Sequence, residues 1–334
     1  MQYCRGPIMA TSATTVVSAE GPLLEQILDS TFTIWHEGLA RDAYARWWAA
    51  QLKTAWGGAR LKRCALVRGG VVLASAKEYH LDAVLDGRPV SVLGLGAVFT
   101  TPDHRGHGYA RELIDRLVER AGEQGAIAAL LFSEIGADYY RPLGFEPVVT
   151  SESIVRVNEA PRRGAPAVLV RAGDDRDVAA IAAMDRVRAE PFRLHLVRGP
   201  DLIRYAIAKK RLLAGLGAPG AREVQFFVAE EGASAVAYVV VSVKGVDWVL
   251  EEAGDRDPSA ARVGAILQAL IARQPAERRP AIRARLPAGF LPPQVSIVES
   301  RPTPDVMMIR PLAGTRISPP LSERDVLYWQ SDVF

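Results

Sequence analysis

The segment 61–132 constrains the fold most, because it arranges apolar runs, turns, a glycine-rich loop and a helix in one order. Three apolar runs come first, separated by the turn signals RGG at 68–70 and DGRP at 86–89. These signals predict an antiparallel meander whose third strand covers residues 90–100. That strand leads into the loop and the helix rather than into another hairpin.

The helix after the loop has one apolar face with the i, i+3, i+4, i+7 spacing typical of a helix packed on a core. The residues on this face are Ala110, Leu113, Ile114, Leu117, Val118 and Ala121. Gly122 and Gly125 are typical of a helix end. The next run, AIAALLF at 126–132, is typical of a strand covered on both faces. The segment therefore predicts an α/β (α+β) fold with a mixed sheet.

The loop itself, TTPDHRGHGYARELI at 100–114, is basic and glycine-rich where a strand ends and a helix begins. Backbone N–H groups at a helix N-terminus lack intrahelical partners and favour anions. Gly106 and Gly108 leave room for an anion to approach these groups, and Arg105 adds a cation. The pattern favours phosphate or pyrophosphate binding. Arg111 stands where the dinucleotide-binding fingerprint needs its last glycine, and the chain contains no P-loop motif.

Two motifs resemble those of the Gcn5-related N-acetyltransferase (GNAT) superfamily. The loop fits the acyl-CoA-binding pattern R-x-x-G-x-A, and the segment 140–145, YRPLGF, resembles the Y-x-x-x-G-F pattern of that family. The resemblance implies that Tyr140 protonates the leaving CoA thiolate and that strand amides of Val98 and Thr100 bind pantetheine. The residues that it places at the CoA pyrophosphate are Arg105, Gly106, His107, Gly108, Tyr109 and Ala110.

The order of elements repeats from about residue 165. The apolar positions of a second helix match those of the first after a shift of 153, namely Val263, Ile266, Leu267, Leu270 and Ile271. Pro258, Ser259 and Ala261 replace Arg105, Gly106 and Gly108 under the same shift. We therefore predict tandem GNAT-like domains, each a mixed, mostly antiparallel sheet flanked by helices, of which the second does not bind CoA. An unrelated α+β domain is the alternative. The predicted division is a disordered leader 1–18, a catalytic domain 19–160, a degenerate domain 165–312 and a tail 313–334.

The tail ends in large apolar residues, whose burial is worth several kcal/mol at ~25 cal/mol per Å². They are Leu327, Tyr328, Trp329 and Phe334. We expect the tail to dock toward the active site, with the carboxylate of Phe334 acting as the base for the amine. Eis-type acetyltransferases, which the chain resembles, supply the precedent, and fungal lysine N6-acetyltransferases are similar too. The chain has no room for the sterol-carrier-like domain of Eis. In the alternative, Trp329 and Phe334 only cover the joint between the halves.

The acceptor site must come from segments outside the two motifs. The segment between the first two helices lines it in this superfamily, which gives Trp35, His36 and Glu37 as candidates. Ser133 and Glu134 follow the strand beside Tyr140 and are further candidates. The predicted function is N-acetyl transfer from acetyl-CoA to a primary amine of a small molecule or a lysine side chain, by direct attack. A non-catalytic acyl-CoA-binding sensor is the alternative.

Composition excludes other classes of function. The net charge is +3 and the 41 basic residues are scattered, which disfavours nucleic-acid binding. No apolar run approaches the ~20 residues of a membrane span. Cys4 and Cys64 are the only cysteines, and the histidines lack metal-ligand spacing, so we expect no metal site and a cytoplasmic location. The sequence leaves homo-oligomer formation open.

Overall fold

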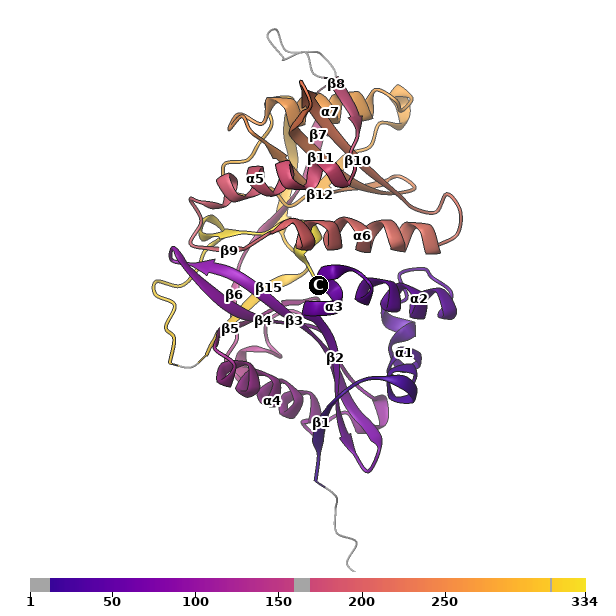
Figure 1. Ribbon diagram of the computed structural model, residues 1–334, viewed down its shortest axis with the longest axis vertical. Coiled ribbons are helices and arrows are strands. Elements are labelled where there is room, and N and C mark those ends of the chain that lie inside the picture. Colours follow the sequence, from indigo (N-terminus) through magenta and orange to yellow (C-terminus); the bar gives the residue numbers. More distant parts are fainter. Residues whose placement is uncertain (1–12, 159–168, 313) are drawn as a thin grey trace, which may run out of the picture.

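The computed structural model describes residues 13–158, 169–312 and 314–334. Its strands form two sheets stacked along the long axis, with helix α6 (Pro200–Leu216) between them (Figure 1). Residues 1–12 of the predicted leader and most of the predicted joint between the domains lie outside the described residues. Residues Thr15–Ser18, also assigned to the leader, instead form strand β1, which pairs with β2. No described helix combines the length and the apolar character needed to cross a membrane.

The first sheet has the order β1-β2-β3-β4-β5-β15-β6, with β9 paired to β3 and β16 paired to β9. Its strands are β1 (Thr15–Ser18), β2 (Leu61–Arg68), β3 (Val71–Leu85), β4 (Arg88–Thr100), β5 (Ala126–Ser133), β6 (Glu146–Val148), β9 (Leu194–Leu196), β15 (Val306–Pro311) and β16 (Val326–Leu327). The predicted meander is confirmed, because β2, β3 and β4 pair antiparallel in sequence order. Strand β4 then pairs parallel with β5, which requires the crossover that the helix provides.

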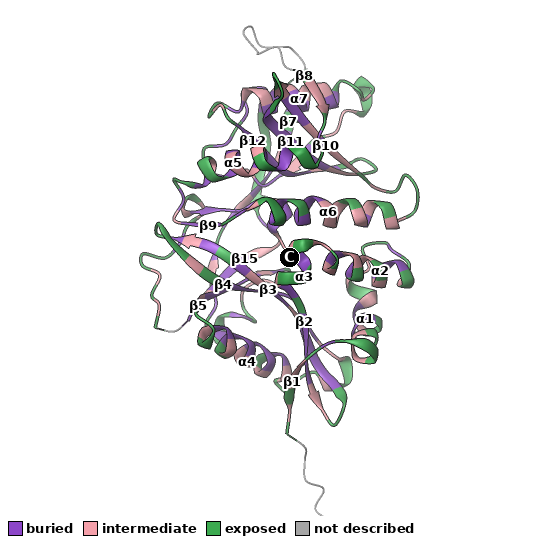
Figure 2. Cartoon of the chain, in the orientation of Figure 1, coloured by how far each residue is buried: buried purple, intermediate pink, exposed green. Residues whose placement is uncertain are grey.

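Helices cover both faces of this sheet. The four are α1 (Gly21–Trp35), α2 (Arg41–Leu52), α3 (Ala55–Arg60) and α4 (Tyr109–Glu123). The predicted apolar face of α4 is buried against one face of the sheet, with Leu113, Ile114 and Leu117 fully enclosed. Side chains of α1, α2 and α6 pack against the other face. Figure 2 colours the buried residues of these helices purple.

The second sheet repeats this plan with the order β14-β7-β13-β12-β11-β10-β8. Its strands are β7 (Ser151–Val157), β8 (Leu169–Ala172), β10 (Glu223–Glu231), β11 (Ser234–Lys244), β12 (Asp247–Asp255), β13 (Ile282–Ala284) and β14 (Val295–Pro302). Helices α5 (Val178–Ala189) and α6 (Pro200–Leu216) cover one face, and α7 (Ala261–Ile271) covers the other. Strands β10 to β12 form a meander, and β12 pairs parallel with β13, as β4 does with β5.

Among the described strands, three belong to the sheet of the opposite half, namely β7 of the first half and β9 and β15 of the second. Strand β7 follows the first sheet in sequence but pairs with β13 and β14 of the second. Strand β15 comes late in the chain and lies between β5 and β6 of the first sheet. The division 19–160 and 165–312 therefore does not separate the hydrogen-bonded sheets, since each half contributes a strand to the other.

The tail returns to the middle of the molecule. Strand β16 pairs with β9, and the side chains of Tyr328 and Trp329 are buried. Trp329 packs edge-to-face against Phe290 at 5.4 Å between ring centroids. The chain ends at Phe334, between α3 and α6 (Figure 1).

Candidate active site

A cavity of about 860 Å³ is lined by residues of both halves. It brings together seven residues that the sequence assigned to the site: Trp35, Glu37, Val98, Ser133, Glu134, Tyr140 and Phe334. His36, among the described residues, is outside this lining, and its Nδ1 accepts a hydrogen bond from the Gly38 N–H at 3.0 Å. Thr100 also lies outside the lining, because β4 has passed the cavity at that point and pairs Thr100 with Ala74 of β3.

Strand β4 separates from β5 at the cavity. The parallel register joins Ser91 to Leu95 with β5, while β4 itself continues to Thr100. A bulge against β3 lies at the separation, where Ala97 adopts a positive φ of 46°. Such a bulge leaves one residue unpaired and redirects the backbone. The register therefore leaves Ala97 and Val98 without a ladder partner in β3 or β5, at a point where both residues line the cavity.

The glycine-rich loop lies at the start of α4. Gly106 and Gly108 both have φ of 79°, a left-handed conformation that a side chain would strain. Gly108 is the N-cap of α4, and no side chain caps this helix start. Arg105 and His107 are exposed around it, and the His107 ring stacks on Tyr109 at 5.8 Å. Exposed N–H groups, the helix dipole and a nearby guanidinium together suit an anionic ligand.

The equivalent helix start in the second half holds a carboxylate of the chain itself. Oδ1 and Oδ2 of Asp255 accept hydrogen bonds from the N–H groups of Asp257 and Arg262, each at 2.9 Å. Asp257 in turn accepts from the Ser259 N–H at 2.9 Å. The N-terminus of α7 is therefore occupied by acidic side chains, which would repel a phosphate.

Tyr140 reaches the cavity from a short 3-10 turn, Arg141–Leu143. Gly144, with φ of 80°, lets the chain reverse, and the Phe145 ring packs edge-on to Tyr140 at 6.0 Å. Burial, with added repulsion from Tyr139 and Glu134, raises the pKa of Tyr140 to about 12. The phenol therefore stays protonated at neutral pH and can act as a proton donor.

The end of the chain lies on the glycines of β4. A Cβ built on Gly94 would lie 2.7 Å from the Phe334 ring, and one on Gly96 would lie 3.1 Å from the Phe334 carbonyl carbon. The ring also packs on Tyr79 at 4.4 Å and on Phe132 at 5.2 Å. The terminal carboxylate is thus placed beside the β4 bulge, in the cavity that Tyr140 also lines.

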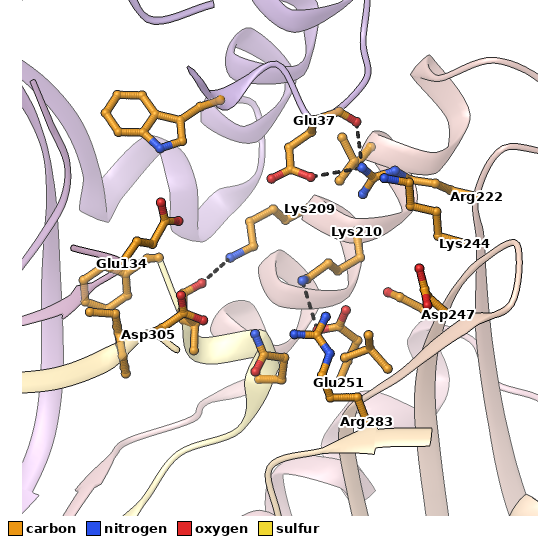
Figure 3. A pocket seen from close by; sticks show the side chains of 18 of the residues that line it. Glu37, Glu134, Lys209, Lys210, Arg222, Lys244, Asp247, Glu251, Arg283 and Asp305 are labelled. Atoms are coloured by element: carbon orange, nitrogen blue, oxygen red, sulfur yellow. Dashed lines mark hydrogen bonds and ion pairs between the residues drawn. The ribbon is translucent and has the colours of Figure 1, made fainter. Parts of the chain in front are cut away.

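Charged side chains from both halves of the chain line the cavity (Figure 3). Glu37 forms an ion pair with Arg222 at 3.0 Å, so the two halves are bridged at one wall. Burial and the nearby Asp305 and Glu37 raise the pKa of Glu134. Lys209 of α6 donates to the carbonyl oxygen of Val333 at 3.3 Å. Acidic and basic side chains of both halves therefore alternate around the cavity.

Sequence reasoning missed most of the lining, including three charged side chains and one tyrosine close to the end of the chain: Lys77, Tyr79, Lys209 and Asp305. Burial, with repulsion from Arg63 and Lys209, lowers the pKa of Lys77 to about 7. Lys77 and Tyr79 are two residues apart on β3, and this spacing predicts that their side chains lie on the same face of the sheet. Lys209 and Asp305 come from the second half, where no motif indicated them.

Glu78, an alternative to Phe334 as the base, is on the wrong face of the sheet. Its carboxylate accepts hydrogen bonds from the Arg120 guanidinium of α4 at 2.7 and 2.8 Å. It also contacts the Cys64 thiol, whose pKa burial and Glu78 raise to about 12. Alternation along β3 sends Glu78 away from the cavity, while Lys77 and Tyr79 face it.

Three features therefore lie close together: a glycine-bearing start of helix α4, the separated ends of strands β4 and β5, and the buried Tyr140. Residues 25–148 match the family model described as an acetyltransferase (GNAT) domain. Over this segment the chain is similar to the GNAT acetyltransferases. No curated protein matches the chain.

Solved structures with the same fold cover both halves. A GCN5-related N-acetyltransferase from Kribbella flavida is 20% identical, with 90% of this chain and 71% of that chain covered and a TM-score of 0.63. Eis1 from Mycobacterium abscessus is 18% identical, with 90% and 73% covered and a TM-score of 0.55. An N-myristoyltransferase from Saccharomyces cerevisiae with bound myristoyl-CoA is 10% identical, with 91% and 80% covered and a TM-score of 0.54. The predicted tandem GNAT fold class is thereby confirmed.

Proposed function

We propose that the protein is a cytoplasmic N-acetyltransferase that moves an acetyl group from acetyl-CoA to a primary amine of a small molecule or a lysine side chain. The observation that carries this proposal is the meeting of three features at one cavity. They are the separated end of β4, the phenol of Tyr140 and the carboxylate of Phe334. The glycine-rich start of α4 follows directly from that strand.

Acetyl-CoA, the acyl donor, binds to residues of the first half of the chain. The amides of the loop 106–110 and the Arg105 guanidinium bind the CoA pyrophosphate, because they combine a helix N-terminus with a fixed cation. The pantetheine arm lies along the free edge of β4 near Val98 and Thr100. A backbone N–H at the bulge polarises the thioester carbonyl and stabilises the negative charge that develops on its oxygen.

Two proton transfers accompany direct attack. An amine of pKa ~10 must lose a proton before it can attack, and the Phe334 carboxylate accepts that proton directly or through water. The nitrogen then bonds to the carbonyl carbon, the C–S bond breaks, and the thiolate takes a proton from Tyr140. A further proton leaves the nitrogen as the amide forms and returns to the Tyr140 phenolate, directly or through water, so that the products are the amide and the thiol. The raised pKa of Tyr140 disfavours this last step, but the same desolvation raises the pKa of the thiol product.

The acceptor enters from the side where the halves meet. Trp35, Glu37, Ser133 and Glu134 line that side, and the carboxylates there favour a cationic amine. The second half contributes α6 and the tail and binds no CoA. No metal takes part in this mechanism.

The decisive test is a coupled thiol-release assay over a panel of amines, aminoglycosides, amino acids and lysine peptides. We expect acetyl-CoA-dependent thiol release with at least one amine. Tight acetyl-CoA binding without release on any amine would instead support an acyl-CoA-binding module.

Adding one or two glycines after Phe334 tests the terminal carboxylate. The extension moves the carboxylate by about 3.5 Å per residue while Trp329 stays packed, so turnover should fall ~10²-fold with little change in melting temperature. The control is one glycine inserted after Gly232, in the turn between β10 and β11. This turn lies at the ends of the two strands opposite to the cavity-lining residues 223, 224 and 242–244. An extended protein that acetylates at the wild-type rate would exclude the carboxylate as the base and leave Glu134 or a water chain.

A further inference from the structure

A buried cluster of charged side chains surrounds Arg198, in the connection between β9 and α6. Its guanidinium forms ion pairs at 3.0 Å with Asp185 of α5 and at 3.0 Å with Asp332 of the tail. It also pairs with Glu252 of β12, whose carboxylate accepts a hydrogen bond from the Ser331 hydroxyl at 2.6 Å. All four side chains of these ion pairs are at most 3% exposed.

This cluster holds the turn that precedes the end of the chain. Oδ2 of Asp332 accepts a hydrogen bond from the Trp329 N–H at 2.8 Å and so closes the turn Gln330–Asp332. Lys209 then binds the carbonyl oxygen of Val333 at 3.3 Å. Phe334 is only two residues beyond Asp332, and two residues span at most ~7 Å. The position of Asp332 therefore limits where the terminal carboxylate can lie.

The cluster contains more carboxyl groups than cations, which is not the arrangement that would give the greatest stability. One guanidinium faces three carboxyl groups, and burial raises the pKa of both Asp185 and Glu252. Buried ion pairs often add little net stability, since desolvation offsets their attraction, whereas they do fix the relative positions of their elements. Here the elements so fixed are α5, β12 and the tail.

We infer that Arg198 is a positioning residue for the acyl transfer: through Asp332 it fixes the turn that places the Phe334 carboxylate in the cavity. The inference rests on the proposed function, because it needs that carboxylate to take part in the reaction. It assigns a task to the half of the protein that lacks a CoA loop. The guanidinium itself does not line the cavity.

The test is Asp332→Asn in the full-length protein, with Arg198→Lys as a second variant that keeps the charge but not the branched geometry. One readout is kcat and KM on the best amine together with acetyl-CoA affinity. The other is the rate at which carboxypeptidase A releases Phe334, which reports tail opening and needs no enzymatic activity. We expect kcat to fall at least 10-fold, acetyl-CoA affinity to stay unchanged, and release of Phe334 to rise at least 10-fold.

Asp177→Asn is the matched control. Asp177 closes a similar turn by accepting from the Asp174 N–H at 3.0 Å, and it is ion-paired with Arg171 at 2.7 Å, also in the second half. Asp177→Asn should lower the free energy of unfolding about as much as Asp332→Asn does, without changing kcat or the rate at which Phe334 is released. This control separates a positioning effect from general destabilisation.

The outcomes are distinct. Wild-type turnover or wild-type release of Phe334 in Asp332→Asn would overturn the inference, as would equal effects in Asp177→Asn. A wild-type protein that acetylates no amine would overturn the proposed function and the reaction role of Arg198 with it. In that case the release of Phe334 still decides whether Arg198 holds the tail.

Discussion

Gly94→Ala should displace the end of the chain without disturbing the CoA loop. The new Cβ would lie 2.7 Å from Cζ of Phe334, 2.9 Å from Cβ of Tyr79 and 3.0 Å from Cδ1 of Leu81. Carbon atoms pack at about 3.5–4.0 Å, so all three contacts must lengthen by ~0.5–1 Å. Tyr79 and Leu81 are buried in the middle of β3, whereas Phe334 is half-buried and tethered on one side only. We therefore expect Phe334 to move.

The expected loss of activity follows from this shift. The carboxyl group of Phe334 lies on Gly96, two residues along β4, so the ring and the carboxylate move together. A misplacement of ~1 Å can cost ~10²-fold in rate, and we expect kcat to fall by ~10 to 10²-fold. Overpacking should lower the free energy of unfolding by ~1–3 kcal/mol. Alanine also reduces the conformational entropy of the unfolded chain relative to glycine, which should offset this loss by ~0.5–1 kcal/mol.

Thiol-release kinetics and urea unfolding of Gly94→Ala give both quantities. The control is Gly122→Ala, because Gly122 lies in α4 with no neighbour within 4 Å of its added Cβ. That variant should keep wild-type turnover and gain slightly in stability. Wild-type kcat in Gly94→Ala would refute the reasoning, since it would mean that the position of Phe334 does not affect the reaction.

Three further predictions concern single groups. Tyr140→Phe should keep acetyl-CoA affinity and lower turnover ~10²-fold; unchanged turnover would leave Tyr140 a packing residue. Calorimetry should find one CoA site per chain, and two equivalent sites would contradict the acidic occupation of the α7 start by Asp255. Burial lowers the pKa of Lys77 to about 7, so between about pH 7 and 10 the unfolded chain binds more protons and stability rises with pH by up to ~1.4 kcal/mol per unit. Urea unfolding of Lys77→Met at pH 7 and 9 should show a smaller rise, and an equal rise would show that Lys77 does not titrate there.

The first half could be predicted largely from local patterns. The turns at 68–70 and 86–89, the apolar face of α4 and the run 126–132 each specify one element through a short-range period. Two parallel strands need a crossover connection, and a helix lies between β4 and β5 in sequence. This order is compatible with the parallel pairing of β4 and β5. The positive φ of Gly106 and Gly108 agrees with the choice of glycine there.

The exchange of β7 and β15 could not be predicted in this way. Both strands are short, and nothing in the pattern of either one distinguishes the two sheets, because their partners are distant in sequence. Residues that reach the cavity from the second half, such as Lys209, depend on that packing. His36 failed for a smaller reason, since the chain turns after α1 and directs Glu37 but not His36 to the cavity.

The exchanged strands and the anchored tail have a common consequence for the cavity. Strand β15 lies beside β5 in the first sheet, and Asp305, just before it, lines the cavity. The tail enters from the opposite direction, held by Arg198 of the second half. If the two halves were only tethered domains, small relative motions would move the carboxylates of Asp305 and Phe334 away from β4. Because each half contributes a strand to the other sheet, such motion would break ladder hydrogen bonds, which keeps groups from both halves in register with Tyr140.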